Sequence, residues 1–234
     1  MLYLAIDTSA NSGSIALEKD GKIIFVFYTD IQITHSERLM PQIEQAFKVN
    51  NLSAKDLDAV LLSNGPGSFT GIRIGLATAK GICYAHQIPL IPFNTLEMHA
   101  VNAIHRNHLI LSVIDAKMNE IYASLYDENL TEKLAPQCCP VDKLVEDLKK
   151  LNISQVILCG DIMEALTIKL TENHIHYHLL AKHQNLNMVT SLFTLFELRQ
   201  VKPVWDMQAF SDLEPYYVRS SLAQINKKDK KTEI

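Results

Sequence analysis

A glycine-rich segment is the strongest candidate for chemistry in this sequence. Four of the eight glycines fall within the run GPGSFTGIRIG at residues 65–75. Glycine lets the backbone pass close to a ligand, and a helix opening near Phe69 would add its positive end, so this loop could hold an anion such as a phosphate. The candidate anion-binding residues are Gly65, Gly67, Ser68 and Gly71.

The same segment allows a second interpretation. Its spacing is not that of a Walker A loop, because no Lys-Ser or Lys-Thr pair follows the last glycine, and it is not the GxGxxG dinucleotide pattern. A tight turn between a strand and a helix would need the same small residues only for packing. The residues alone leave both interpretations open.

A further polar candidate follows the first apolar run, LYLAID at residues 2–7. The carboxylate of Asp7 could orient a magnesium-bound water or a nucleotide phosphate, and the hydroxyls of Thr8 and Ser9 could donate to phosphate oxygens. An ordinary polar turn has the same composition. Asp115 holds the matching place later in the chain, but no hydroxyl residue follows it directly, so the two places are not chemically equivalent.

Nine histidines raise the question of a metal site. His174, His176 and His178 alternate, so on a strand they would share a face and could bind a divalent ion. No cluster of carboxylates or cysteines supports such a site, and ordinary surface or half-buried imidazoles are the favoured alternative. We therefore predict no metal site, and no Ser-His-Asp arrangement can be assigned from the sequence.

The composition indicates a soluble globular chain. With 234 residues and 47% hydrophobic content, the chain is long enough for two modest lobes that share an interface. The net charge of -4, with both signs scattered, does not indicate a nucleic-acid or membrane surface. No apolar run approaches the roughly 20 residues of a membrane span, and the N-terminus lacks the features of a signal peptide. The four cysteines have neither metal nor disulfide spacing, so we expect a cytoplasmic protein with reduced thiols.

Alternating strands and helices must position these residues. Three short apolar segments separated by polar turns predict a three-strand meander over residues 2–27. Thr34 and Glu37 have the spacing of a capping box, which predicts the start of a helix. The further predicted elements are a strand at 58–63, a helix after the glycine-rich run, a strand at 88–93 and a helix capped by Thr95.

An internal repeat indicates two related lobes. The segment LILSVID at 109–115 repeats the opening strand at an offset of 108 residues, because Asp115 matches Asp7. Strands alternating with helices predict sheets covered by helices. The predicted elements of the second half are helices at 141–151, 162–173 and 187–200 and a strand at 155–159. We place the lobes at 1–105 and 106–220, and we expect the lysine-rich end, 221–234, to be a disordered tail, with contact to RNA as the alternative.

Several of these segments together resemble one protein family. They are similar to the bacterial TsaB (YeaZ) proteins of tRNA threonylcarbamoyladenosine biosynthesis, over most of the chain up to about residue 220. The resemblance implies an α/β fold of the actin/Hsp70 (ASKHA) superfamily with two RNase H-like lobes, the second reduced. The segments that carry it are LAIDTS (4–9), HSERLMPQIEQ (35–45), SNGPGSFTGIRIGLATAKG (63–81), IDAKMNEIYASLY (114–126) and PYYVR (215–219).

The function that this resemblance implies is a role inside a complex. In the family, the protein pairs with its paralogue TsaD, which transfers threonylcarbamoyl onto adenosine 37 of tRNAs that read codons beginning with A, and the ATPase TsaE joins the assembly. Contact with tRNA is then indirect, through the complex. We expect this chain to bind no cofactor by itself, with ATP or ADP at the complex interface, and to form a homodimer when the paralogue is absent.

The resemblance also implies that catalysis is lost. TsaD would place a metal-binding pair of histidines where this sequence has Thr95 and His99, so only one imidazole remains. One imidazole cannot replace a platform of two on one helix face, which predicts a non-catalytic subunit. The helices at 36–49 and 69–84 are then expected to pack against TsaD. The expected interface residues are His35, Leu39, Ile43, Phe69, Ile72, Arg73, Leu76 and Lys80.

Two functions of other classes stand as alternatives. The first is an autonomous ATPase or small-molecule kinase of the same superfamily that uses Asp7, the loop at 65–71 and closure of the lobes. Against it, only Gly160 follows a strand in the second half, which is little for an adenosine pocket. The second is a metal-dependent hydrolase, which the histidine pattern does not favour.

Overall fold

The first lobe is built on a mixed sheet of five strands. The computed structural model describes residues 1–31, 34–186 and 188–219. The strand order is β3-β2-β1-β4-β5, in which β2 is antiparallel to both neighbours and β1, β4 and β5 are parallel. The predicted meander is therefore confirmed. The strands are β1 (Leu2–Asp7), β2 (Gly13–Lys19), β3 (Lys22–Thr29), β4 (Ala59–Ser63) and β5 (Leu90–Phe93).

The second sheet repeats the topology of the first. Its order is β8-β7-β6-β9-β10, with β7 antiparallel to both neighbours and β6, β9 and β10 parallel. The repeat read from the sequence at an offset of 108 residues is thus a repeat of structure, and the two related lobes are confirmed; the boundary at 105 and 106 stays a prediction. The strands are β6 (Ile110–Lys117), β7 (Glu120–Tyr126), β8 (Glu132–Pro140), β9 (Gln155–Gly160) and β10 (His176–Leu179).

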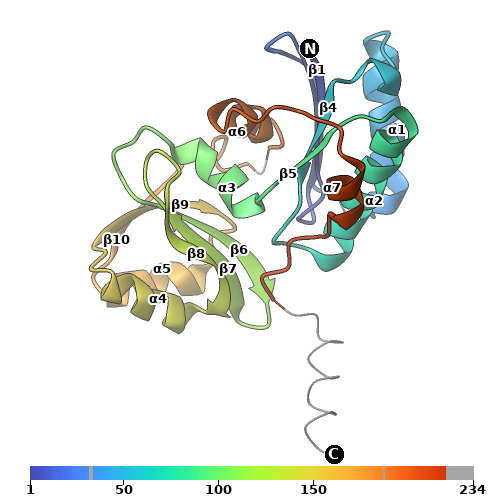
Figure 1. The fold of residues 1–234 in the computed structure, drawn as a ribbon. Coiled ribbons are helices and arrows are strands. Elements are labelled where there is room, and N and C mark those ends of the chain that lie inside the picture. The colour runs from blue at the N-terminus through green and yellow to red at the C-terminus, as the bar shows by residue number, and fades with distance from the viewer. Residues whose placement is uncertain (32–33, 187, 220–234) are drawn as a thin grey trace, which may run out of the picture.

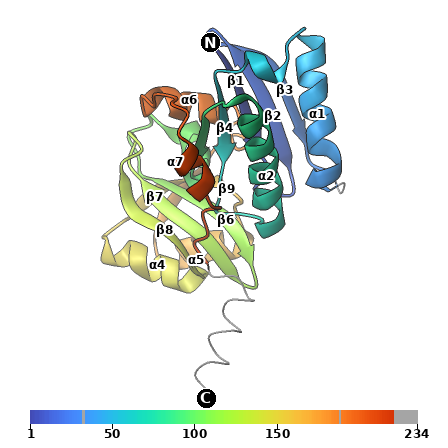
Figure 2. The same cartoon turned by 45° about the vertical axis from the view of Figure 1, so that its right-hand side comes forward.

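Helices cover the outer faces of the sheets and fill the space between them (Figures 1 and 2). Apolar residues at helical spacing, such as Leu39 and Ile43, give each outer helix one face that packs on its sheet. The outer helices of the second lobe are the shorter ones, so its reduction lies in its helices and not in its sheet. The outer helices are α1 (His35–Val49) and α2 (Phe69–His86) on the first sheet and α4 (Val141–Lys150) and α5 (Glu164–Glu172) on the second.

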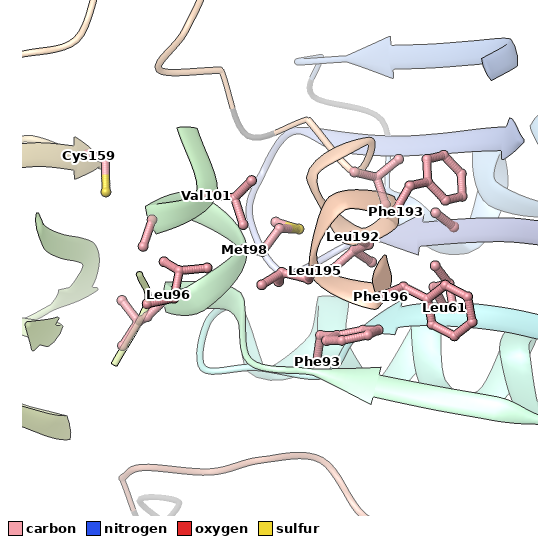
Figure 3. Close-up of a cluster of buried hydrophobic side chains, with 14 of the residues drawn as sticks. Leu61, Phe93, Leu96, Met98, Val101, Cys159, Leu192, Phe193, Leu195 and Phe196 are labelled. Atoms are coloured by element: carbon pink, nitrogen blue, oxygen red, sulfur yellow. The ribbon is translucent and has the colours of Figure 1, made fainter. Parts of the chain in front are cut away.

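The lobes share a hydrophobic core. Helices α3 (Thr95–Ala100) and α6 (Ser191–Leu198) supply Leu96, Met98, Leu192 and Leu195, which Figure 3 shows between the elements of the two lobes. All four side chains are buried. Burying one such side chain contributes about 1.5–3 kcal/mol, so this shared core holds the lobes in one relative position.

The described chain ends in a segment that crosses both lobes, and we call residues 205–219 the C-terminal strap. Its helix α7 (Met207–Asp212) is capped by Asp206, whose carboxylate accepts hydrogen bonds from two backbone amides of the first turn. Trp205 and Phe210 pack against the core of the first lobe, 4.9 Å apart between ring centroids. Part of the range assigned to the second lobe therefore lies on the first, because these rings find their apolar surface there.

The strap is also fixed by polar contacts at both lobes. Near its end the Tyr216 amide donates to the Asn64 carbonyl at 2.8 Å, and the Asn64 side chain donates back to the Glu214 carbonyl at 2.8 Å. Arg219 then pairs with Glu120 of β7 at 3.0 Å. The strap thus joins the loop after β4 to the second sheet. The predicted tail at 221–234 lies outside the described residues.

One predicted helix cap is confirmed in position but not in its hydrogen bonds, and another is wrong: Thr34 is the N-cap residue of α1, as predicted. The Thr34 side chain makes no cap bond to α1 and contacts the Ser36 hydroxyl at 3.0 Å, so the capping box does not form. At α3 the cap is Asn94, whose Oδ1 accepts from the Leu96 amide at 2.8 Å. Thr95 is the first residue of that helix instead. In both cases the hydroxyl has found a side-chain partner in place of the backbone.

Candidate functional site

The glycine-rich loop is filled by the chain's own turn after β1. A Cβ added at Gly71 would lie 2.0 Å from the Thr8 carbonyl oxygen, and one at Gly67 would lie 2.3 Å from the Ser9 carbonyl oxygen. The Thr8 hydroxyl donates to the Gly71 carbonyl at 2.7 Å, and the Ser68 amide donates to the Ser9 carbonyl at 2.6 Å. These contacts favour the packing interpretation of the glycines. Phosphate binding at this loop stays a prediction.

The first glycine of the loop contacts the strap. Gly65 has a φ of 109°, a conformation that favours glycine, and a Cβ there would lie 2.6 Å from the Tyr216 carbonyl oxygen. The Gly65 carbonyl itself accepts from the Thr95 amide at 2.8 Å. The strap therefore covers Gly65, and the turn after β1 covers Gly67 and Gly71.

A buried polar pair lies between the lobes. Asp7 is 1% exposed, and one of its carboxylate oxygens accepts from the Ser9 amide at 3.0 Å. His99 is 3% exposed, and neither of its ring nitrogens has a hydrogen-bond partner within the described residues. Burial lowers the pKa of His99 to about 4, against the opposing effect of the Asp7 charge. The imidazole is therefore neutral near pH 7 and is enclosed by protein.

The two positions that resemble a metal pair are both used internally. The Thr95 hydroxyl is fully buried and lies 2.8 Å from the Ser63 hydroxyl of β4. His99 faces Gly160 at the end of β9, where a Cβ would lie 2.8 Å from the ring Nδ1. Thr95 and His99 therefore lie within the shared interior and not at an open face of the molecule.

The three alternating histidines do not all lie on one strand. His174 lies in a turn with a φ of 58°, before β10 begins at His176. Only His176 and His178 therefore share the strand. His178 instead lies beside His108, with ring centroids 5.5 Å apart. Within residues 1–31, 34–186 and 188–219, no group of three or more His, Cys, Asp and Glu is placed to hold a metal ion.

A pocket of about 290 Å³ opens between the lobes. On the second lobe, the Lys117 ammonium lies 2.5 Å from the Asp115 carboxylate. Burial alone would raise the pKa of Asp115, but the hydrogen bonds and charge of Lys117 lower it, so the carboxylate is ionised and paired. The lining includes Ser9, Gly67, Ser68 and Phe69 from the first lobe and Asp115, Lys117, Tyr122 and Asp161 from the second.

Most of the expected partner residues lie inside the first lobe. Four of the eight are buried apolar side chains, with exposed fractions between 1% and 7%, and three of these belong to the hydrophobic core of the first lobe. His35 is also buried, with its Nε2 2.7 Å from the Ala10 carbonyl oxygen. All five side chains are buried within this chain, and those of Leu39, Ile43 and Leu76 pack on the first sheet, so burial does not favour their contact with a partner, which stays a prediction. The three core residues are Leu39, Ile43 and Leu76, and the fourth buried residue is Ile72.

The other three expected partner residues hold the strap. The Arg73 guanidinium lies 3.7 Å from the centroid of the Phe69 ring, and its Nε donates to the Tyr217 hydroxyl at 2.7 Å. Phe69 and Tyr217 stack at 4.9 Å. Lys80 donates to the Ser211 carbonyl at 3.2 Å. One flank of α2 is therefore covered by the chain itself.

A different stripe of α2 is open to solvent. Ala77, Gly81 and Ala85 are exposed and recur every four residues, so they lie along one line of the helix. A Cβ added at Gly81 would have no atom within 4 Å, whereas one at Gly75 would lie 2.3 Å from the Thr8 hydroxyl. The small residues of this helix thus serve two different contacts. Their spacing in the sequence could have separated the open stripe from the buried one.

Comparisons with known proteins place the chain in a family. The family model for TsaD, tRNA N6-adenosine threonylcarbamoyltransferase, matches residues 29–192. The TsaB protein of Bacillus subtilis is 34% identical over 58% of this chain and 60% of its own length, and that of Escherichia coli is 36% identical over 55% and 57%. The TsaB protein of Buchnera aphidicola subsp. Schizaphis graminum is 31% identical over 68% of this chain and 78% of its own length. The chain therefore spans about three fifths of the length of the Bacillus and Escherichia relatives.

Solved structures confirm the predicted actin-like fold. YeaZ from Pseudomonas aeruginosa aligns with a TM-score of 0.69 at 22% identity, over 92% of this chain and 99% of that one. A Bacteroides thetaiotaomicron protein with an actin-like ATPase fold aligns with a TM-score of 0.50 at 10% identity, over 82% and 95%. Within the residues that the structure describes, no helix is both long and apolar enough to cross a membrane. From the matched relatives and the shared topology, this chain belongs to the TsaB (YeaZ) family.

Proposed function

We propose that this chain is the non-catalytic partner subunit of the enzyme that adds threonylcarbamoyl to adenosine 37 of tRNAs reading codons that begin with A. The proposal is supported by relatives named as tRNA threonylcarbamoyladenosine biosynthesis proteins and by the match to the family model of the transferase. The catalytic partner is then the paralogue TsaD, with the ATPase TsaE as a third component. The complex works in the cytoplasm, and the tRNA contacts this chain only through it.

The main support for the proposal is that Thr95 and His99 both make contacts inside the chain. The Thr95 hydroxyl is bonded to Ser63, and the one imidazole is enclosed between the lobes against Gly160. A catalytic metal needs ligands that converge on an open coordination position. Thr95 and His99 are buried between the lobes and do not supply such a position, so we assign the transfer reaction to the partner.

The surface that we assign to the partner is the open stripe of α2. Close packing of two helices is easiest where small residues let the backbones approach, and Ala77, Gly81 and Ala85 provide such a line. The strap leaves this stripe uncovered, since it contacts the flank that carries Arg73 and Lys80. The same stripe would pair two copies of the chain when TsaD is absent.

Replacing Gly81 by arginine is expected to abolish co-purification with TsaD. A long charged side chain would keep the partner helix away, while the fold is unaffected because the position opens to solvent. The measurement is co-purification of tagged TsaD with each variant, with far-UV circular dichroism to confirm folding. The matched control is Glu146→Arg, an exposed position on α4 of the second lobe, which should co-purify like the wild type. Equal recovery of TsaD with Gly81→Arg and the wild type would refute this surface.

The function itself is tested by reconstitution. Transfer RNA is incubated with threonine, bicarbonate, ATP, TsaD, TsaE and the enzyme that forms the threonylcarbamoyl adenylate, with and without this chain. Modified adenosine, counted by mass spectrometry after digestion, is expected to fall to background without the chain. Full modification in its absence would refute the proposed role.

A nucleotide-binding function is the second candidate, and the pocket between the lobes favours it. Its volume of about 290 Å³ is near the lower limit of small-molecule sites, and Ser9, Ser68 and Lys117 supply polar contacts. Calorimetric titration of ATP and ADP into the isolated chain, and then into the complex with TsaD, distinguishes an autonomous nucleotide-binding enzyme from a partner subunit. Binding and turnover by the isolated chain would support the autonomous enzyme, whereas binding only in the complex would support nucleotide at the shared interface.

A further inference from the structure

Two histidines meet at the outer edge of the second sheet. His178 lies on β10, the edge strand, and His108 precedes β6, which lies two strands away. Gln155, the first residue of β9, lies between them. Its Nε2 is 2.6 Å from the His178 Nε2 and 3.1 Å from the His108 Nε2. The two imidazoles come from segments that are 70 residues apart in the sequence, and the order of the strands brings them together.

The Nε2 atoms of both imidazole rings point at the same atom, the Gln155 Nε2. An amide nitrogen of glutamine carries only donors, so each imidazole nitrogen that contacts the Gln155 Nε2 must be an acceptor. His108 agrees with this assignment independently, since its other nitrogen, Nδ1, lies 2.7 Å from the Asn107 carbonyl oxygen. The carbonyl can only accept a hydrogen bond, so Nδ1 carries the proton and donates, which leaves the ring's lone pair on Nε2.

The contact of the His108 Nδ1 with a backbone carbonyl is one that metal-binding histidines commonly have. A ligating imidazole commonly donates its second nitrogen to a backbone carbonyl, which orients the ring and raises the basicity of the ligating nitrogen. Imidazole nitrogens suit the divalent ions of nickel, copper and zinc. All three side chains are accessible from solvent, so exposed side-chain torsions can bring the two Nε2 atoms to metal-bonding distance.

We propose that His108 and His178, with Gln155 between them, form a surface site for one divalent transition-metal ion. The two imidazoles supply nitrogen ligands, and the ion displaces the glutamine amide from the point where their lone pairs meet. Water fills the other coordination positions. The site is independent of the proposed function, because it lies on the second sheet and the partner stripe lies on α2.

Neighbouring His176 provides a matched control. It lies on the same strand as His178, and its register partner is Gln155, but neither ring nor hydrogen-bond contacts with His108 are found for it in the described residues. It is also exposed. A site that needs two converging imidazoles should depend on His108 and His178 and not on this third histidine.

The test is a calorimetric titration of Ni²⁺ into the untagged chain, because nickel prefers imidazole and is less drawn to the cysteines than zinc is. The wild type is expected to bind one equivalent. His108→Ala and His178→Ala should each weaken binding by at least about tenfold, the lower end of the loss that follows even outer-shell changes at metal sites. His176→Ala should bind like the wild type. Circular dichroism checks that each variant is folded.

A variant that should bind nickel more tightly provides a second test. Gln155→His would place a third imidazole at the point on which the other two converge, and we expect binding to tighten by about tenfold or more. An unchanged affinity in this variant would overturn the proposed convergence. A wild type without saturable nickel binding, or a His176→Ala variant as weak as His178→Ala, would overturn the site.

Discussion

Replacing Gly160 by alanine is expected to destabilise the chain by about 4 kcal/mol or more, the range reached only by severe single substitutions. Gly160 ends β9 with a φ of 90°, and a Cβ there would lie 2.1 Å from the Val113 carbonyl oxygen. The backbone cannot shift to relieve this clash easily. Asn185 holds both the amide and the carbonyl of Gly160, each at 2.9 Å.

Gly21→Ala is the matched control, because it measures the cost of the backbone conformation without the steric clash. Gly21 has a similar φ of 75°, but a Cβ there would meet no atom within 4 Å. The cost at this position is that of a left-handed conformation alone, about 1–2 kcal/mol. Urea denaturation of the two variants and the wild type measures both costs. A Gly160→Ala variant that is no less stable than Gly21→Ala would contradict the described packing between β9 and β6.

Ile43→Glu is expected to unfold the first lobe and not merely to weaken an interface. Ile43 is 2% exposed in the core under α1, and a carboxylate enclosed there has no partner for its charge. We expect a loss of about 4 kcal/mol or more. Thermal denaturation followed by circular dichroism measures this loss on the isolated chain, where no partner contributes.

Met40→Glu, one turn earlier on the same helix, is the matched control. Met40 is 51% exposed, so a carboxylate there stays in water and the stability should change by no more than about 0.5 kcal/mol. If both variants melted together with the wild type, the assignment of Ile43 to the core would be wrong. The pair thus distinguishes a residue that supports the fold from one that faces solvent.

The sequence predicts the sheets well, because their signals are local. Short apolar runs such as LYLAID and LILSVID mark buried strands, and their repetition at a fixed offset predicts two related lobes. The edge strands β8 and β10 give no such signal. β8 contains Pro136 and Pro140, and β10 is mainly exposed, so neither has the continuous apolar pattern of a buried strand.

The candidate site is harder to predict, because periodicity does not say what a face packs against. Leu39 and Ile43 form an apolar stripe on α1, and such a stripe looks alike whether it contacts its own sheet or another protein. The glycines pose the same difficulty. Gly71 and Gly81 have the same side chain, but one is filled by Thr8 and the other faces solvent.

The sequence of the strap predicts even less of its structure. Helix α7 has six residues, too few for a helix that is stable by itself, and it depends on the packing of Phe210 against Trp205 and Tyr84. Contacts between residues far apart in sequence, such as Arg73 with Tyr217, leave no pattern within either segment. Only the folded chain shows them.

The place of the strap in the chain has a consequence for how the molecule is made. Both sheets are complete once β10 ends at Leu179, and α6 and the strap, which fasten one lobe to the other, are synthesised afterwards. Each sheet can therefore pair its strands as it leaves the ribosome, before α6 and the strap are available. Translation order thus lets two similar sheets form one at a time, which lowers the chance that a strand of one is exchanged for its counterpart in the other.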